Sequence, residues 1–408
     1  MVLLVVAVTV VACGGESTPT EDAEGLYIGG PEFTASPAVT TEPTAAPSED
    51  EATPTPRVYS ETAGEVGSLA PDLSGISGWI NTGEFTLGSL RGEVVLVDFW
   101  TYTCVNCLRT LPYLRDWHEK YDDLGLNIIG VHTPEFEFEK DYDNVLAAVK
   151  EYDLGWRMAQ DNDFRTWRSY NNRYWPAKYL IDHEGVIRYR HFGEGRYDET
   201  EEWIRDLLTE IGADLSGIEV NADTGPKLDQ GAFDDQGRVL QTRELYAGAR
   251  RNSGASVPYI GNNTYYFTPL DGAEVYSDPG QHQTHYLYLK GAWVKGLESI
   301  EHDRATENLE DYIALKFFGT SVNVVINSDN GDPYEVVITL DDQPVPREAW
   351  GDDLQVNGEE MTVIRVDGPR MYRLIRLPSY GSHELKLSSN SEDFNVYAFT
   401  FGSYSTGF

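Results

Sequence analysis

Residues 93–107 read EVVLVDFWTYTCVNC and hold the most informative pattern in the chain. The run EVVLVDFW is short, almost wholly apolar and rich in β-branched side chains, as is typical of a strand buried on both faces. From Cys104 onward, apolar side chains recur at helical spacing, at Leu108, Leu111, Leu114 and Trp117. The stretch therefore predicts a buried strand, a tight turn and a helix whose first turn holds two cysteines.

Cys104 and Cys107 are separated by two residues at the predicted start of this helix. A thiolate there faces the positive end of the helix dipole and unpaired N–H groups, which stabilise negative charge on the sulfur. The second sulfur follows one helical turn later, close enough for a disulfide. Zinc would need two further ligands, and neither His118 nor His132 supplies a recognisable second half. We expect a redox-active cysteine pair with no metal and no other cofactor.

The surrounding residues 67–213 alternate between predicted strands and helices. Further strands are expected at 126–131, 178–182 and 186–191, and helices at 138–152, 163–170 and 198–211. Parallel strands linked by crossover helices predict an α/β sandwich.

Two short motifs carry a family resemblance. Val97–Trp100 (VDFW) precedes the cysteines, and Tyr174–Ala177 (YWPA) precedes a predicted strand. Both resemble the thioredoxin superfamily, in which a cis-proline loop faces the active-site disulfide. Residues 70–73 (APDL) resemble its TlpA-like branch, and residues 130–135 (GVHTPE) are similar to the C-terminal portion of DipZ-like proteins. The resemblance implies a thioredoxin-like fold and thiol–disulfide oxidoreductase activity.

Roles for four residues follow from this chemistry and from the resemblance. Cys104, nearer the helix terminus, is expected to attack a substrate disulfide, and Cys107 to resolve the mixed disulfide. Asp98, in the buried strand, should have a raised pKa through desolvation and shuttle the proton of Cys107. Glu135 follows the next strand and is either a second acid near the sulfurs or a solvated loop carboxylate.

Three further residues are expected to bind substrate. The resemblance places Pro176 beside Cys104, where it would hold the substrate backbone. Trp100 and Trp175 are predicted walls of the site, although either side chain would equally suit a core.

Residues 235–408 are predicted to form an all-β sandwich or jelly roll. Strands are expected at 285–289, 313–325 (as two segments), 334–340, 361–366, 372–377, 383–387 and 394–401. Residues 381–387 and 396–401 resemble the end of DipZ-like chains, whose last domain looks like a carbohydrate-binding module. If exposed, Tyr286, Tyr288, Trp293 and Tyr312 would be the residues to stack on sugars. Alternating aromatic residues in a sandwich more often pack in its core or in cross-strand pairs.

The N-terminal segment is predicted to target and tether the protein. Residues 2–12 are apolar but too short to span a bilayer, and Cys13 ends a VVAC sequence that resembles a bacterial lipobox. We expect residues 1–13 to be a lipoprotein signal with Cys13 as the lipid anchor, or a plain signal peptide with an incidental cysteine. Residues 14–66, rich in Pro, Thr and acidic side chains, predict a disordered tether. A linker is expected at 214–234.

Composition narrows the range of functions. With 31 basic and 67 acidic residues, the net charge of −36 argues against nucleic-acid binding. The leading prediction is an extracytoplasmic, membrane-anchored oxidoreductase that reduces protein disulfides, with a membrane electron carrier as redox partner and apocytochrome c among its candidate substrates. The alternatives are a peroxiredoxin-type thiol peroxidase, suggested by the T-x-x-C at Thr101–Cys104, and a non-enzymatic glycan-binding surface lipoprotein.

Overall fold

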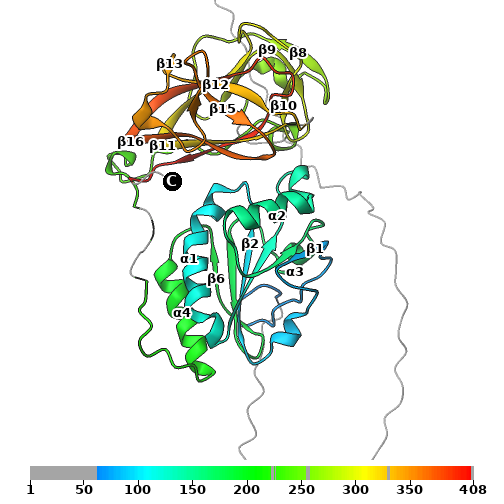
Figure 1. Cartoon of the computed structure of the whole chain (residues 1–408), viewed down its shortest axis with the longest axis vertical. Helices are drawn as coiled ribbons and strands as arrows, with labels where there is room; N and C mark the ends of the chain where they lie inside the picture. Colours follow the sequence, from blue (N-terminus) through cyan, green and yellow to red (C-terminus); the bar gives the residue numbers. More distant parts are fainter. Residues whose placement is uncertain (1–61, 222–224, 226, 254–257, 329–330, 406–408) are drawn as a thin grey trace, which may run out of the picture. The chain divides into compact units, whose positions relative to one another are not determined.

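A computed structural model (Figure 1) describes residues 62–221, 225, 227–253, 258–328 and 331–405. The predicted signal peptide, the lipid-anchor residue Cys13 and all but the last few residues of the predicted tether lie outside these ranges. Residues Arg57–Phe408 belong to one compact unit. Among the described residues, no helix is both long enough and apolar enough to cross a bilayer.

The first domain is built on a six-stranded sheet in the order β1-β4-β3-β2-β5-β6. Its strands are β1 (Gly78–Ile80), β2 (Val94–Trp100), β3 (Leu126–His132), β4 (Arg157–Gln160), β5 (Ala177–Ile181) and β6 (Ile187–Phe192). Its α-helices are α1 (Val105–Tyr121), α2 (Tyr142–Glu151), α3 (Arg165–Ser169) and α4 (Tyr197–Glu210), and its 3₁₀ turns are η1 (Leu87–Leu90), η2 (Asp122–Leu124) and η3 (Glu137–Lys140).

The sheet is mixed, which corrects the prediction of parallel strands. Strands β2, β3 and β4 are parallel, whereas β5 runs antiparallel to β2 and pairs with β6 in a hairpin. The short connection between β5 and β6 allows only an antiparallel pair, because a parallel pair needs a crossover of a dozen or more residues. The thioredoxin-like α/β class is confirmed.

Side chains of β2 alternate between two cores on opposite faces of the sheet. Val94, Leu96 and Trp100 share one core with residues of α1, α2 and α4, while the intervening apolar residues pack with α3 on the other face. Figure 1 shows α1 and α4 on the same side of the sheet. Because strand side chains alternate, Asp98 faces the same side as Leu96 and Trp100, toward α1 and its cysteines.

The helix predicted at 138–152 begins later than expected. Residues Glu137–Lys140 form the 3₁₀ turn η3, and α2 starts only at Tyr142. Asp141 caps α2 by accepting hydrogen bonds from the backbone N–H groups of Asp143 and Asn144. The side-chain cap therefore sets the start of the helix inside the predicted range.

The second domain contains an eleven-stranded antiparallel sheet. Its strands are β7 (Leu245–Tyr246), β8 (Ala273–Tyr276), β9 (Leu287–Lys295), β10 (Ile300–His302), β11 (Tyr312–Asn327), β12 (Tyr334–Leu340), β13 (Gln343–Pro344), β14 (Gln355–Val356), β15 (Thr362–Val366), β16 (Arg370–Ser388) and β17 (Asn395–Gly402). A short helix α5 (Ala249–Asn252) follows β7, and the 3₁₀ turns are η4 (Gln230–Ala232), η5 (Asn263–Tyr266) and η6 (Arg347–Ala349). An α/β domain followed by a β-rich domain is thus confirmed.

Two pairs of predicted strands are each one long strand. The segments expected at 372–377 and 383–387 join in β16, and the two segments expected within 313–325 join in β11. Strands β11 and β16 pair along most of their length, with register shifts between Gly319 and Ser321 and between Val322 and Asn323. A bulge bends a strand without ending it. The breaks in the apolar pattern of these two segments therefore correspond to bends within β11 and β16, and not to turns between separate strands.

The aromatic residues predicted to stack on sugars are divided by burial. Trp293 and Tyr288 are buried, at 0% and 6% exposure, so of the two readings core packing holds for these two rings. Tyr312 directs its hydroxyl to Asp278, and Tyr286 is half-buried beside Tyr288. The four rings therefore form no shared exposed platform.

Candidate active site

Cys104 lies at the N-cap of α1, immediately before its first residue Val105. Its sulfur accepts a hydrogen bond from the backbone N–H of Cys107 at 3.2 Å. Cys104 is half-buried and Cys107 is fully buried, and both are free cysteines. Burial, with Cys104 beside it, raises the pKa of the Cys107 thiol well above its ordinary value. The accessible sulfur thus accepts a backbone N–H, and the buried sulfur needs help to lose its proton.

Asp98 lies in β2 and forms a buried ion pair with Lys178 of β5, at 3.1 Å between Nζ and Oδ1. The two residues are cross-strand partners in the β2–β5 register. Desolvation raises the pKa of Asp98, while the charge of Lys178 opposes that rise. The predicted direction of the shift is confirmed, but the lysine was missed. A single Lys in the otherwise apolar strand AKYLI was the available signal.

Trp175 and Pro176 precede β5 and are joined by a cis peptide bond. The indole N–H of Trp175 donates to the carbonyl of Thr133 at 3.0 Å, which ties this loop to the end of β3. Trp100, by contrast, is only 1% exposed and lies edge-on to His132. Of the two readings left open for these tryptophans, the core fits Trp100, whereas Trp175 lines the pocket at Cys104.

Glu135 contacts residues of the β-rich domain. The hydroxyl oxygen of Tyr246 in β7 lies 3.0 Å from its Oε1, and Nη2 of Arg251 in α5 lies 2.5 Å from the same oxygen. Desolvation raises the pKa of Glu135 to about 7, against the lowering effect of Arg251. Of the two readings left open by the sequence, the solvated loop carboxylate does not fit, since only 14% of this side chain is exposed.

Glu139 is a fully buried carboxylate that the sequence analysis missed. Its Oε1 accepts a hydrogen bond from the Thr103 hydroxyl at 2.5 Å, and its Oε2 accepts from the backbone N–H groups of Glu135 and Phe136. These bonds link the residue before Cys104 to the loop that carries Glu135. The acidic run PEFEFEKD looks solvated in the sequence, so it offered no signal that one of its carboxylates turns inward.

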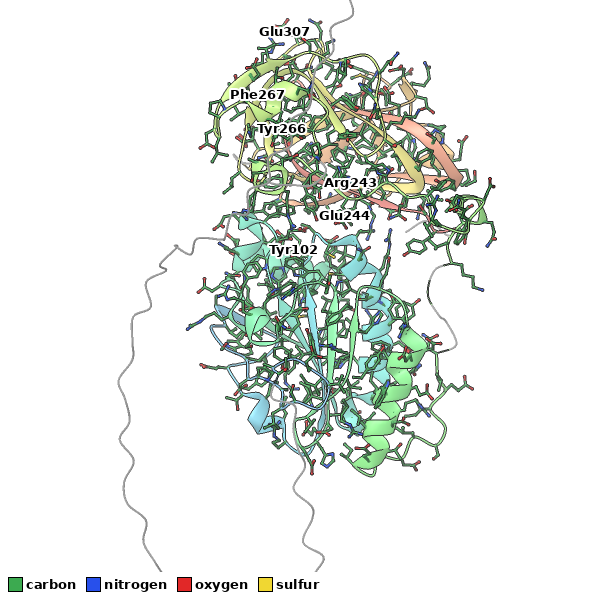
Figure 2. The ribbon with its side chains drawn as sticks, turned by 180° about the vertical axis from the view of Figure 1, so that it is seen from behind. Tyr102, Arg243, Glu244, Tyr266, Phe267 and Glu307 are labelled. Atoms are coloured by element: carbon green, nitrogen blue, oxygen red, sulfur yellow. The ribbon has the colours of Figure 1, made fainter. Side chains whose placement is uncertain are left out.

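These groups surround a small pocket of about 60 Å³ at Cys104. The first domain contributes Thr103, Cys104, Asn106, Glu135, Phe136 and Trp175, and the β-rich domain contributes Glu244, Tyr246, Val325, Ala398 and Thr400. Asp98, Cys107 and Pro176 do not line it. Figure 2 labels Glu244, beside Arg243 in the β-rich domain, and Tyr102, two residues before Cys104. Cys104 thus borders a space that both domains line.

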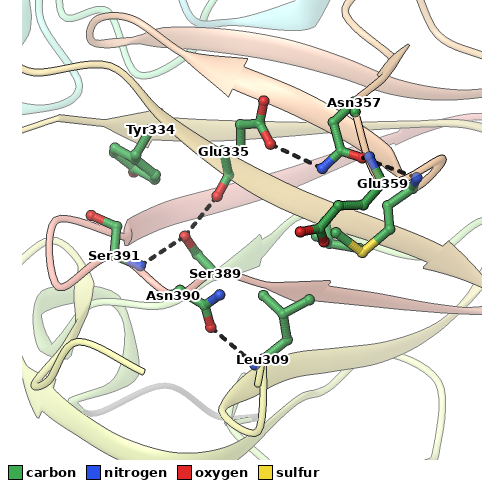
Figure 3. Close-up of a pocket in the computed structure, with 11 residues that line it drawn as sticks. Leu309, Tyr334, Glu335, Asn357, Glu359, Ser389, Asn390 and Ser391 are labelled. Atoms are coloured by element: carbon green, nitrogen blue, oxygen red, sulfur yellow. Dashed lines mark hydrogen bonds between the residues drawn. The ribbon is translucent and has the colours of Figure 1, made fainter. Parts of the chain in front are cut away.

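A larger hollow of about 520 Å³ lies within the β-rich domain (Figure 3). Its lining includes Glu335, which accepts a hydrogen bond from the Asn357 amide at 3.1 Å, and Ser389, whose hydroxyl donates to the backbone carbonyl of Glu335. None of the residues predicted from the sequence to bind substrate or sugar lines this hollow.

Comparison with known proteins agrees with this geometry. Residues 66–190 match a model described as the AhpC/TSA family, and residues 242–402 match one described as a thioredoxin-like C-terminal domain. The thiol-disulfide oxidoreductase YkuV of Bacillus subtilis is 30% identical over 141 residues, which are 34% of this chain and 94% of that protein. The chain belongs to the thioredoxin-like thiol-disulfide oxidoreductase family.

Other similar proteins match different shares of the chain. Protein DipZ of Mycobacterium tuberculosis is 34% identical over 337 residues, or 82% of this chain. The chain spans only 43% of that relative's length. Among solved structures, the thioredoxin domain of a thiol-disulfide oxidoreductase from Bacteroides vulgatus is 28% identical, covers 34% of this chain and 98% of its own, and has a TM-score of 0.30.

Proposed function

We propose that the protein reduces disulfide bonds in other proteins through Cys104 and Cys107. The Cys104 thiolate attacks the substrate disulfide and forms a mixed disulfide, which releases one substrate thiol. Cys107 then loses its proton and attacks the Cys104 sulfur, which releases the second thiol and leaves a Cys104–Cys107 disulfide. Two electrons pass from the cysteine pair to the substrate.

The unequal environment of the two sulfurs is the observation that carries this proposal. Cys104 is accessible and accepts a backbone N–H, whereas Cys107 is buried with a raised pKa. A buried resolving thiol suits a cycle in which it reacts only with the neighbouring sulfur. Asp98, on the same face of the sheet as α1, is the proposed base for Cys107, and Lys178 holds that carboxylate in place.

The setting of the reaction is a further part of the proposal. The apolar residues 2–12 and Cys13 support a lipid-anchored protein on the extracytoplasmic side of a bacterial membrane. The spacer Val105–Asn106 lacks a histidine that would stabilise a thiolate, which favours a reductant over an oxidant. A membrane electron carrier is then the proposed source of electrons, and cytochrome c maturation is one candidate role.

Thiol peroxidase activity is the alternative. The threonine of the T-x-x-C motif, Thr101, is fully buried, and its hydroxyl lies 3.2 Å from Nε2 of His132. This alternative is disfavoured because a hydroxyl engaged in that way does not face a peroxide at Cys104. Peroxide consumption by the reduced protein separates the two functions, because a disulfide reductase should remove peroxide slowly in comparison with a protein disulfide.

The cysteine roles can be tested in an insulin-reduction assay. Cys104→Ser should abolish turnover, because no attacking thiolate remains, and Cys107→Ser should instead accumulate mixed disulfides with substrate. Non-reducing electrophoresis identifies those adducts. Cys107→Ser reducing insulin catalytically at the parental rate would contradict the two-cysteine cycle.

A further inference from the structure

The Tyr246 hydroxyl lies between two carboxyl groups at the pocket that holds Cys104. It is 3.0 Å from Oε1 of Glu135 and 2.9 Å from Oε2 of Glu244. All four residues line the same small space of about 60 Å³. Glu135 comes from the loop after β3, whereas Tyr246 and Glu244 lie in and just before β7. Backbone pairing of Tyr246 with Ala398 of β17 holds the tyrosine at this position.

The single proton of the Tyr246 hydroxyl cannot make a full hydrogen bond to both carboxyl groups at once. A phenol has one O–H and donates one hydrogen bond, while its oxygen still accepts another. Tyr246 therefore donates fully to one carboxyl group, and a proton on Glu135 would turn the second contact into a hydrogen bond as well. The cluster of Glu135, Tyr246 and Glu244 is thus arranged to bind one proton more than two free carboxylates would hold.

The surroundings of the cluster favour a proton that is retained but exchangeable. Arg251 is the cation facing it, with Nη2 on Glu135 and the guanidinium 4.6 Å from the centre of the Tyr246 ring. Glu139 adds a further negative charge, and the Tyr259 ring lies against that of Tyr246. Two carboxyl groups at one site disfavour ionisation of both, and burial raises the pKa of Glu135 to about 7.

We propose that the cluster of Glu135, Tyr246 and Glu244 donates a proton to the thiolate that leaves a substrate disulfide at Cys104. The β-rich domain then supplies part of the catalytic machinery. The inference rests on the proposed function, because it concerns the leaving group of the same reaction. A space of about 60 Å³ lined by both domains keeps the leaving sulfur close to the cluster.

The step is balanced in atoms and electrons. The Cys104 thiolate forms a bond to one substrate sulfur as the substrate S–S bond breaks, and the other sulfur leaves with the electron pair. The cluster transfers its proton to that thiolate, which leaves as a neutral thiol. The cluster becomes more negative by one charge and regains a proton from solvent before the next cycle. Cys107 supplies the second electron pair when it resolves the mixed disulfide.

Two small disulfides with different leaving groups test this step in the reduced full-length chain. Hydroxyethyl disulfide releases an alkyl thiolate that benefits from protonation, whereas dithiobis(nitrobenzoate) releases an aromatic thiolate that is stable without a proton. Tyr246→Phe removes the bridging hydroxyl but keeps the ring. It should slow single-turnover reduction of the alkyl disulfide about 10²-fold and change the aromatic reaction by no more than about twofold.

Glu244→Gln should give the same pattern with Tyr246 intact, which separates proton donation from a packing defect. Tyr259→Phe is the matched control, since it deletes a hydroxyl from the ring next to Tyr246 outside the pocket lining, and both of its rates should match the parent. Equal slowing of both substrates, or of neither, in Tyr246→Phe and Glu244→Gln would overturn the proposal while leaving the cysteine cycle intact. Retained reduction in Cys104→Ser would instead contradict the proposed function itself.

Discussion

The two sulfurs of the active site have carboxylates of contrasting kinds beside them. On the side of Cys107, Asp98 pairs with Lys178 on a neighbouring strand of the same sheet, and both side chains are at most 2% exposed. On the side of Cys104, Glu135 pairs with an arginine, Arg251, that belongs to the other domain and is 44% exposed. The first pair is buried within one core, and the second lies at the rim of a pocket.

The difference separates two ways of controlling a proton. A buried ion pair depends strongly on both partners, because either charge left alone in the core is costly. A half-exposed pair is worth little in stability, yet its cation still affects the ionisation of the carboxyl group. We therefore expect substitution of Lys178 mainly to lower the free energy of unfolding. Substitution of Arg251 should mainly change the pH dependence of the proposed reaction.

The largest effect is expected from Lys178→Met, which leaves Asp98 unpaired in the core. Near neutral pH the free energy of unfolding should fall by about 3–5 kcal/mol. Desolvation already raises the pKa of Asp98, and loss of Lys178 raises it further, so the native carboxyl binds a proton more tightly than the unfolded one. Stability is therefore lost as pH rises above the ordinary value of 3.8 and recovers as pH falls toward it. Urea unfolding across this pH range measures the effect.

Asp98→Asn should also destabilise the protein, because it leaves the Lys178 cation unpaired. The double variant Asp98→Asn/Lys178→Met removes both charges and should lie within about 1 kcal/mol of the parent. If the loss in free energy of unfolding in the double variant equalled the sum of the losses in the two single variants, the two residues would not act as a pair.

A smaller effect is expected on the rate of the resolving step. The double variant Asp98→Asn/Lys178→Met lacks the proposed base, so attack by Cys107 on a mixed disulfide should slow about 10²-fold at neutral pH. Because the pKa of Cys107 is raised well above its ordinary value, most of this thiol is protonated there. The deficit should shrink as pH rises and the thiol ionises unaided. Single-turnover release of the second substrate thiol gives the rate.

Lys178→Met alone keeps the carboxyl group and is the control for that measurement. At a pH where both variants are folded, it should resolve the mixed disulfide faster than the double variant. The same rate and the same pH profile in both variants would remove Asp98 from the proton path.

The smallest effect on stability is expected from Arg251→Met, at no more than about 1 kcal/mol, because the arginine of this pair is 44% exposed. Arg251 lowers the pKa of Glu135, so the variant should raise that pKa above about 7. A proton donor stays active until pH exceeds its pKa, and the high-pH loss of alkyl-disulfide reduction should therefore move to higher pH. The pH profile of that rate is the measurement.

Arg250→Met is a matched control on the same short helix. Arg250 pairs with Glu298 at 2.5 Å and has no ion pair with Glu135 among the described residues. Its pH profile should coincide with that of the parent. A shift in Arg250→Met as large as that in Arg251→Met would point to a general effect of net charge instead.

The sequence predicted those parts of the site that are encoded locally. All of the run EVVLVDFW except its first residue forms β2, and the helix after it begins at Val105, within one residue of the expected start at Cys104. Hydrophobic pattern and a short motif suffice there, because a strand, a turn and a helix N-terminus involve consecutive residues. The direction of the Asp98 pKa shift followed in the same way, from placing a carboxyl group in a buried strand.

The groups that the sequence did not predict come from residues far apart in the chain. Lys178 meets Asp98 only through the pairing of β2 with β5, and Tyr246 meets Glu135 across 111 positions. Glu139 lies in an acidic run and turns inward because it receives three donors from residues 103, 135 and 136. Such pairings depend on tertiary contacts, about which the composition of a segment carries little information.

Apolar packing between the domains has a consequence for how they can be separated. Val325, Met371, Tyr397 and Ala398 of the β-rich domain belong to the same buried cluster as residues of α1. The thioredoxin-like domain of this protein therefore shares part of its core with the β-rich domain. Cutting the chain between the domains would expose an apolar surface near Cys104. Exposed apolar surfaces of this kind promote aggregation and nonspecific binding.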